Sequence, residues 1–225
     1  MNLQYDFSNT VTTEFGIGKD NGLGQTFFLM TVDADVQEAL REMVIATWSA
    51  MQSEGSAPDK YDPSEKHGGI EYLYLPLKHT LSKGMRELHE AVNIPLNATA
   101  LKDPTTVFCY FTRMTDKTGQ QLTGLRRATQ FKGALKKRFI QLHTNALKLV
   151  QDPLFKLDQD FDLLIDADHL HILRPSGFEF AGKLQDAIMA AVPKNISLIQ
   201  SELPDRKSTR LNSSHNQRSR MPSSA

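Results

Sequence analysis

A run of basic side chains with no acidic one among them occupies residues 125–139. Its six cations are Arg126, Arg127, Lys132, Lys136, Lys137 and Arg138. Lysine and arginine displace condensed counterions when they bind phosphates, and six such contacts to duplex DNA would make log affinity fall with log salt at a slope of about −5. Such contacts grip the backbone and do not read the bases. The run therefore predicts sequence-independent binding to phosphodiesters. The alternative is a solvated face on which the aliphatic parts of the Lys and Arg side chains cover apolar surface.

Acidic side chains recur along residues 158–168, and carboxylates in such a cluster can hold Mg²⁺ for phosphodiester hydrolysis. They are Asp158, Asp160, Asp162, Asp166 and Asp168. Between this cluster and Pro204, no Glu-x-Lys or Asp-x-Lys sequence follows to complete the usual nuclease strand. We expect these aspartates to serve in turns and caps, and a divalent-metal nuclease is the alternative.

The other candidate residues predict structural roles. His169 and His171 lie two apart on an expected strand, and two histidines are too few for a closed metal site. We expect them on a polar outer face, with Leu170 and Ile172 pointing inward. The only cysteine, Cys109, lies in an apolar run and is expected to be a buried strand residue. The sequence thus predicts no catalytic residue, no metal and no cofactor.

Residues 16–24 (GIGKDNGLG) contain a Gly-Lys pair but lack the glycine and the Ser or Thr that a phosphate-binding loop requires around it. We therefore expect a loop or hairpin turn there and no nucleotide site. No segment reaches about 18 uninterrupted apolar residues, and the N-terminus has no signal-peptide layout. A soluble, cytoplasmic protein is expected.

Short strands with turn residues between them, together with amphipathic helices, predict an α+β fold with a mostly antiparallel sheet built from hairpins. One helix is expected where apolar residues recur at helical spacing between Val36 and Met51. Hairpins are expected in residues 105–130 and 161–175, and another one turning at residues 144–145. Residues 131–142 fit either a helix or a strand, with the change from one to the other near Arg138.

Three regions are expected along the chain: an N-terminal α+β region (1–103), a second α+β region (104–204) and a disordered tail (205–225). The tail resembles a translated sequencing adapter, which makes Pro204 the last natural residue and predicts that the natural protein continues beyond it. The whole chain has 26 basic and 26 acidic residues. Because the tail holds five basic residues and one acidic residue, residues 1–204 hold 21 and 25 and are mildly acidic.

Three stretches of the second region together form a pattern of fixed residues. They are Arg126-Arg127 followed by Phe131-Lys132, Phe155-Lys156-Leu157 followed by Phe161-Asp162, and Pro175 followed by Gly177-Phe178-Glu179. On this pattern, residues 125–204 resemble the domain of KwaB, a component of the Kiwa anti-phage defence system. The resemblance implies a bacterial defence protein, truncated at its C-terminus, that associates with DNA and self-associates. It also implies action beside the membrane protein KwaA, without membrane insertion of its own. A non-enzymatic DNA-binding protein is the favoured interpretation, and a nuclease or a protein-interaction scaffold are the alternatives.

Overall fold

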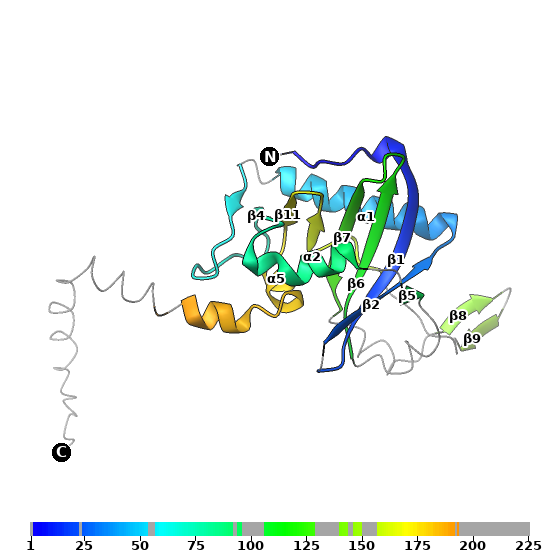
Figure 1. Ribbon diagram of the computed structural model, residues 1–225. Helices are drawn as coiled ribbons and strands as arrows, with labels where there is room; N and C mark the ends of the chain where they lie inside the picture. Colours follow the sequence, from blue (N-terminus) through cyan, green and yellow to red (C-terminus); the bar gives the residue numbers. More distant parts are fainter. Residues whose placement is uncertain are drawn as a thin grey trace, which may run out of the picture. The chain divides into compact units, whose positions relative to one another are not determined.

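The computed structural model describes residues 2–22, 24–53, 57–91, 94–95, 106–128, 140–143, 146–149, 157–191 and 193, with the backbone alone for 140–143 and 146–149 (Figure 1). The chain divides into two compact units. The larger unit comprises residues 1–62 and 66–185, and the smaller one comprises residues 63–65 and 186–225. Residues 186–191 of the smaller unit are helical.

A nine-stranded sheet organises the larger unit. Its strands are β1 (Thr10–Asp20), β2 (Gln25–Thr31), β3 (Asp59–Lys60), β4 (Leu73–Pro76), β5 (Ile94–Pro95), β6 (Val107–Asp116), β7 (Gln121–Arg127), β10 (Leu163–Ile165) and β11 (His169–Ile172). Their order across the sheet is β3-β4-β11-β10-β7-β6-β1-β2-β5. Strand β7, which carries the first two predicted cations, thus lies in the middle of the sheet.

The α+β class is confirmed, whereas the expected sheet of mostly antiparallel hairpins needs correction. The sheet is mixed, because β2 pairs with β5 and β3 pairs with β4 in parallel. Three hairpins are present, β1–β2, β6–β7 and β10–β11. They are joined by pairs between strands that are distant in the sequence, namely β1–β6, β7–β10 and β4–β11. Long-range pairing, and not local turns alone, therefore assembles the sheet.

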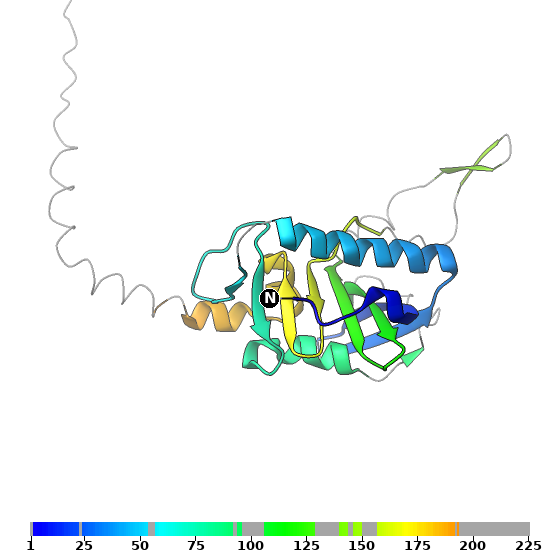
Figure 2. The same cartoon turned by 90° about the horizontal axis from the view of Figure 1, so that it is seen from above.

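Helix α1 (Ala34–Ser53) lies along one face of the sheet, and helix α2 (Lys83–Glu90) lies along the opposite face (Figure 2). Asp33 caps α1 by accepting a hydrogen bond of 2.9 Å from the backbone N–H of Val36, as its residue type predicts. The buried side of α1 follows the expected helical spacing: Leu40, Met43, Val44, Thr47 and Met51. These side chains join the main apolar core with residues of β1, β6 and β7.

The opposite face is covered by α2 together with α5 (Pro175–Ala181). Two 3-10 helices complete the larger unit, η1 (Phe7–Asn9) and η2 (Thr80–Ser82). Helix α5 begins at Pro175, a position that suits proline because the first N–H of a helix has no partner within it. Its buried side consists of Pro175, Gly177, Phe178 and Ala181.

A separate two-stranded sheet follows β7 in the sequence. It pairs β8 (Ile140–His143) with β9 (Ala146–Leu149), with Ile140 opposite Leu149. This confirms the hairpin expected around residues 144–145. Of residues 131–142, for which helix and strand were both open, 140–142 belong to β8 and 131–139 lie outside the described residues.

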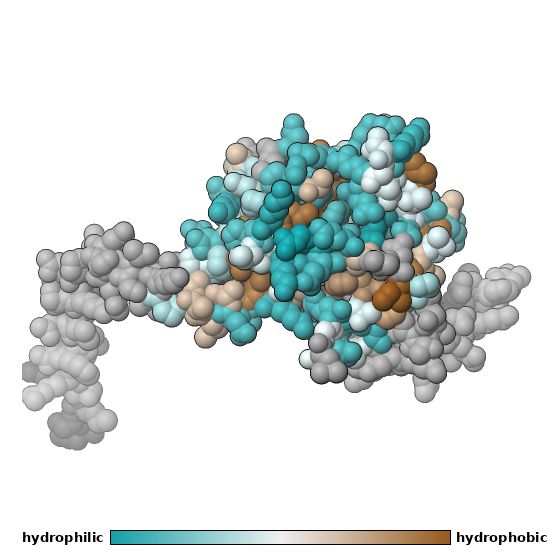
Figure 3. Space-filling view, in the orientation of Figure 1, coloured by the Kyte–Doolittle hydropathy of each residue, from teal (hydrophilic) through white to brown (hydrophobic). Residues whose placement is uncertain are grey.

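The boundary expected between residues 103 and 104 also lies outside the described residues, as does the expected tail at 205–225. Strands from both sides of that boundary belong to the one nine-stranded sheet. Residues 16–20, expected in a turn, continue β1, so the turn to β2 is shorter than predicted. Among the helices that the structure describes, none is both long and apolar enough for a membrane crossing. The face in Figure 3 is largely hydrophilic, with separate small apolar areas.

Candidate functional site

The predicted cationic run begins at the end of β7. Arg126 and Arg127 are the last two residues of that strand. The other four predicted cations, Lys132, Lys136, Lys137 and Arg138, lie outside the described residues. The environment of the two arginines is therefore the part of the predicted site that the structure defines.

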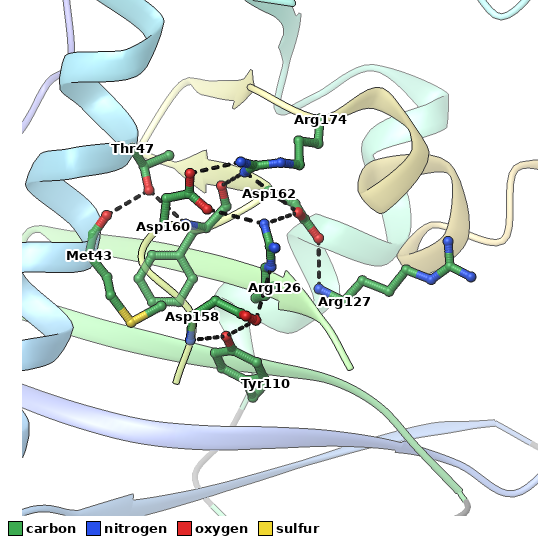
Figure 4. A network of polar contacts seen from close by, with 10 residues as sticks. Met43, Thr47, Tyr110, Arg126, Arg127, Asp158, Asp160, Asp162 and Arg174 are labelled. Atoms are coloured by element: carbon green, nitrogen blue, oxygen red, sulfur yellow. Dashed lines mark hydrogen bonds and ion pairs between the residues drawn. The ribbon is translucent and has the colours of Figure 1, made fainter. Parts of the chain in front are cut away.

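Three carboxylates surround the guanidinium group of Arg126 (Figure 4). Its Nε lies 3.3 Å from Oδ2 of Asp158, and its Nη1 lies 3.2 Å from Oδ1 of Asp160 and 2.8 Å from Oδ1 of Asp162. With Arg174 these residues form what we call the aspartate–arginine cluster. Arg126 was one of the predicted phosphate ligands, but its charge is already matched by carboxylates.

Arg174 is the member of the cluster that sequence reasoning missed. Its Nη2 lies 2.7 Å from Oδ2 of Asp160, and its Nη1 donates a hydrogen bond of 3.1 Å to the carbonyl oxygen of Phe161. Nothing in the local sequence marks this arginine, because it is distant from Arg126 along the chain. Only the pairing of β7 with β10 brings the two together.

Asp162 is the most buried carboxylate of the cluster, with 3% of its surface exposed. Its Oδ2 accepts a hydrogen bond of 2.7 Å from the backbone N–H of Arg127, and its own N–H donates to the carbonyl oxygen of Leu125 at 2.8 Å. Its carbonyl oxygen accepts from the N–H groups of Leu173 and Arg174. Asp162 thus connects the end of β7 by hydrogen bonds to the residues between β11 and α5.

Burial and the neighbouring charges have opposite effects on the pKa values of Arg126 and Asp162. Burial alone would lower the pKa of Arg126, but the carboxylates of Asp162, Asp158 and Asp160 outweigh it and raise that pKa. Burial raises the pKa of Asp162 by more than the Arg127 N–H and the two guanidinium groups lower it. The cluster therefore keeps Arg126 charged and places its least solvated carboxylate at the centre.

Asp162 and its neighbour Phe161 pack closely against two glycines. A Cβ atom on Gly177 of α5 would lie 2.4 Å from Oδ2 of Asp162, and one on Gly124 of β7 would lie 2.8 Å from the ring of Phe161. Thr47 of α1 holds the same segment from above, because its Oγ1 accepts a hydrogen bond of 2.7 Å from the N–H of Phe161. A Cβ atom at either glycine would therefore force the contacting side chain or its neighbours to move.

Arg127 has a different environment from its neighbour. Side chains of adjacent strand residues point to opposite faces of a sheet, and Figure 4 shows the Arg127 side chain extending away from the three aspartates. Its guanidinium carbon lies 4.0 Å from the centre of the Phe180 ring in α5. Among the described residues, no carboxylate pairs with this guanidinium, and its Nε has no hydrogen-bond partner. Arg127 is the described cation that best fits a role outside the fold.

The histidines of β11 do not lie as expected. His171 is fully buried, with Nδ1 3.1 Å from the hydroxyl of Tyr72 and Nε2 2.9 Å from Oδ2 of Asp166. The expectation of a polar outer face was wrong because β11 is an inner strand and helices cover both faces of the sheet there. His169 is partly buried, while Leu170 and Ile172 are buried as expected.

Asp166 takes the turn role predicted for it. Its Oδ1 accepts hydrogen bonds from the backbone N–H groups of Asp168 and His169, and its Oδ2 accepts one from Gln4. Burial alone would raise the pKa of Asp166, but the hydrogen bond with His171 and the backbone N–H groups lower it to about 2. Asp166 therefore ties the N-terminal segment to the β10–β11 turn.

The described residues give the nuclease alternative no support. Asp158, Asp160 and Asp162 are bound by guanidinium groups, and no group of three or more His, Cys, Asp or Glu within the described ranges could hold a metal ion. Cys109 is buried as expected, and burial raises the pKa of its thiol. Its setting therefore disfavours a reactive thiolate.

Comparison with family models, with curated proteins and with solved structures finds no match to this chain. The resemblance of residues 125–204 to KwaB therefore stays a prediction. The site has to be interpreted from its own chemistry.

Proposed function

We propose that this protein binds DNA through its phosphate backbone and does not cut it. The contacts come from the last residue of β7, Arg127, and from the four cations that follow this strand in the sequence: Lys132, Lys136, Lys137 and Arg138. The observation that carries the proposal is the absence of any acidic residue from 125–139 in a chain whose first 204 residues are mildly acidic. A local excess of positive charge of this kind favours polyanions.

The aspartate–arginine cluster supports this proposal. Three carboxylates lie beside the start of the cationic run, and unpaired carboxylates there would repel phosphates. Arg126 and Arg174 pair with all three of them. Much of the negative charge next to Arg127 is therefore balanced within the fold.

The cluster also changes the expected number of contacts. Because three carboxylates hold Arg126, we leave it out of the phosphate-binding set, which reduces the set from six cations to five. Five phosphate contacts correspond to a slope of about −4.5 in a plot of log affinity against log salt concentration on duplex DNA. The slope therefore measures how many cations bind.

The test incubates the protein with a labelled DNA duplex and Mg²⁺ and follows both retardation and cleavage on a gel. We expect retarded, intact DNA whose binding weakens steeply with salt. The double variant Lys136→Glu/Lys137→Glu should lose retention at moderate salt, because it reverses two contacts. The matched control is Lys78→Glu/Lys117→Glu, which changes the net charge equally at two exposed lysines remote in sequence from the run.

Three results would overturn the proposal. Equal loss of binding in both double variants would indicate a nonspecific charge effect. Cleavage that EDTA abolishes would favour the nuclease alternative. Failure of the unmodified protein to bind DNA, together with binding to polyglutamate, would favour a scaffold that contacts an acidic protein surface.

On the resemblance of residues 125–204 to KwaB, we also propose a role in anti-phage defence in the bacterial cytoplasm. In this proposal the protein self-associates and acts beside the membrane protein KwaA. The test is a plaque assay on cells that express the protein with and without a KwaA partner. Protection that requires both proteins and is lost in Lys136→Glu/Lys137→Glu is expected, and protection that survives this variant would separate defence from DNA binding.

A further inference from the structure

Phe180 is an exposed aromatic residue on an otherwise packed helix. The other apolar side chains of α5, including Phe178 and Ala181, are buried. Phe180 is 44% exposed. Its ring is therefore not needed to fill the core between α5 and the sheet.

The ring of Phe180 lies against a cation that no carboxylate of the described residues neutralises. The guanidinium carbon of Arg127 lies 4.0 Å from the ring centre, within the range of a cation–π contact. Two neighbouring acids are engaged elsewhere, since Glu179 accepts a hydrogen bond from the Tyr61 hydroxyl and Asp162 accepts one from the Arg127 backbone N–H. The contact therefore leaves the charge of Arg127 available to a phosphate.

A guanidinium beside an accessible aromatic ring has the chemistry of a nucleotide contact. Proteins that bind single strands combine cations along the backbone with aromatic rings on which bases stack, and each stacked base contributes about 1–3 kcal/mol. Bases of a duplex are already stacked on their neighbours and cannot reach a ring at the surface. An aromatic–cation pair at the start of a basic run thus favours a single strand.

We propose that Phe180 and Arg127 together bind one nucleotide of single-stranded DNA, with the base stacked on Phe180 and the phosphate bound by Arg127. The inference rests on the proposed DNA-binding function and specifies the form of DNA. Phe180 adds recognition of an unpaired base to the phosphate contact of Arg127. The site is distinct from the aspartate–arginine cluster, which occupies the other face of β7.

The experiment measures fluorescence anisotropy with three labelled probes: a thymidine strand of about 12 nucleotides, an abasic phosphodiester strand of the same length, and a duplex. Phe180→Ala should weaken binding of the thymidine strand by about 5- to 150-fold, which corresponds to the loss of one stacked base. Binding of the abasic strand and the duplex should stay within about twofold, because those probes offer no free base. Arg127→Ala should weaken binding of all three probes.

Matched variants separate stacking from folding. Phe180→Trp keeps a stacking surface and should bind the thymidine strand like the unmodified protein, whereas Phe180→Leu keeps an apolar side chain and should bind like Phe180→Ala. Ile45→Ala changes an apolar residue of the same 44% exposure on α1 and should alter no affinity. Unchanged thermal unfolding midpoints show that the variants are folded.

The outcomes distinguish this inference from the proposed function. Wild-type binding to all three probes with no effect of Phe180→Ala overturns the inference and leaves the proposed function standing. An equal loss for all three probes in Phe180→Ala also overturns it, because stacking cannot affect the abasic strand. Failure of the unmodified protein to bind any probe overturns both proposals.

Discussion

The carboxylate of Asp162 accepts a hydrogen bond of 2.7 Å from the backbone N–H of Arg127, which joins the end of β7 to the residue just before β10. The same carboxylate lies 2.8 Å from Nη1 of Arg126. One buried side chain therefore holds the last two residues of β7 at once. The position of Arg127, and so of the proposed nucleotide contact, depends on it.

Replacing Asp162 with alanine should destabilise the protein by about 3 kcal/mol, because it leaves buried guanidinium groups and a backbone N–H without their acceptor. Asp162→Asn keeps an oxygen acceptor but loses the charge, and it should cost about 1–2 kcal/mol. Urea denaturation, followed by the fluorescence of Trp48, measures both values. The exposed Asp168→Ala is the control and should stay within about 0.5 kcal/mol of the unmodified protein; equal effects of Asp162→Ala and Asp168→Ala would contradict the role of the cluster.

Gly177→Ala should destabilise the protein by about 1–3 kcal/mol, because the added Cβ would overlap the Asp162 carboxylate and force α5 or that carboxylate to move. Gly69→Ala is the matched control, since nothing lies within 4 Å of the Cβ it would add. Thermal unfolding compares the two variants. A Gly177→Ala protein as stable as Gly69→Ala would show that α5 does not pack closely on Asp162.

Stability should fall as the pH drops from about 6.5 to about 4 because of His89. Burial, with a smaller effect of Arg113, lowers the pKa of His89 from 6.5 to about 4. The unfolded chain binds the proton in this interval and the folded protein does not, so acid favours unfolding by about 3 kcal/mol in total. Denaturation at several pH values should show a weaker dependence in His89→Gln.

The control for His89 is its hydrogen-bond partner. Thr123 Oγ1 lies 2.9 Å from Nδ1 of His89. Thr123→Val removes this contact but keeps the buried imidazole, so it should retain most of the pH dependence between 6.5 and 4. Identical pH profiles of His89→Gln and the unmodified protein would rule out His89 as the titrating group.

Asp166 should produce a second loss of stability at lower pH. Its pKa of about 2 in the folded protein lies below the ordinary value of 3.8. Its contribution, about 2 kcal/mol, is complete above pH 4 and disappears as the pH falls through about 2. Asp166→Asn should be less stable at pH 7 and should lose less between pH 4 and pH 2, as measured by denaturant unfolding; parallel profiles in that interval would contradict this assignment.

Local patterns predicted much of the secondary structure. The apolar spacing of α1 and its cap at Asp33 depend on neighbours in the sequence, and so do the β6–β7 and β10–β11 hairpins. The parallel strands β3 and β5 have two residues each, which is too short for an alternating pattern to be recognised in the sequence. Their omission explains why the sheet was expected to be mostly antiparallel.

Side-chain partners across the sheet could not be predicted in the same way. The pairing of Arg126 with Asp158, Asp160 and Asp162 depends on how β7 meets β10, and neither segment carries a signal for the other. The burial of His171 depends on helices that cover both faces of the sheet at β11. Alternation along a strand predicts two faces, but it cannot say that both are covered.

The bonds around Asp162 also bear on how this protein can evolve. The aspartate–arginine cluster holds Arg126, near the end of β7, against Asp158, which lies 32 positions further along the chain. The entropic cost of bringing two points of a chain together rises by only about 0.6 kcal/mol for each doubling of the number of residues between them. A change in the number of residues between these two points should therefore cost little stability as long as the residues of the cluster are kept.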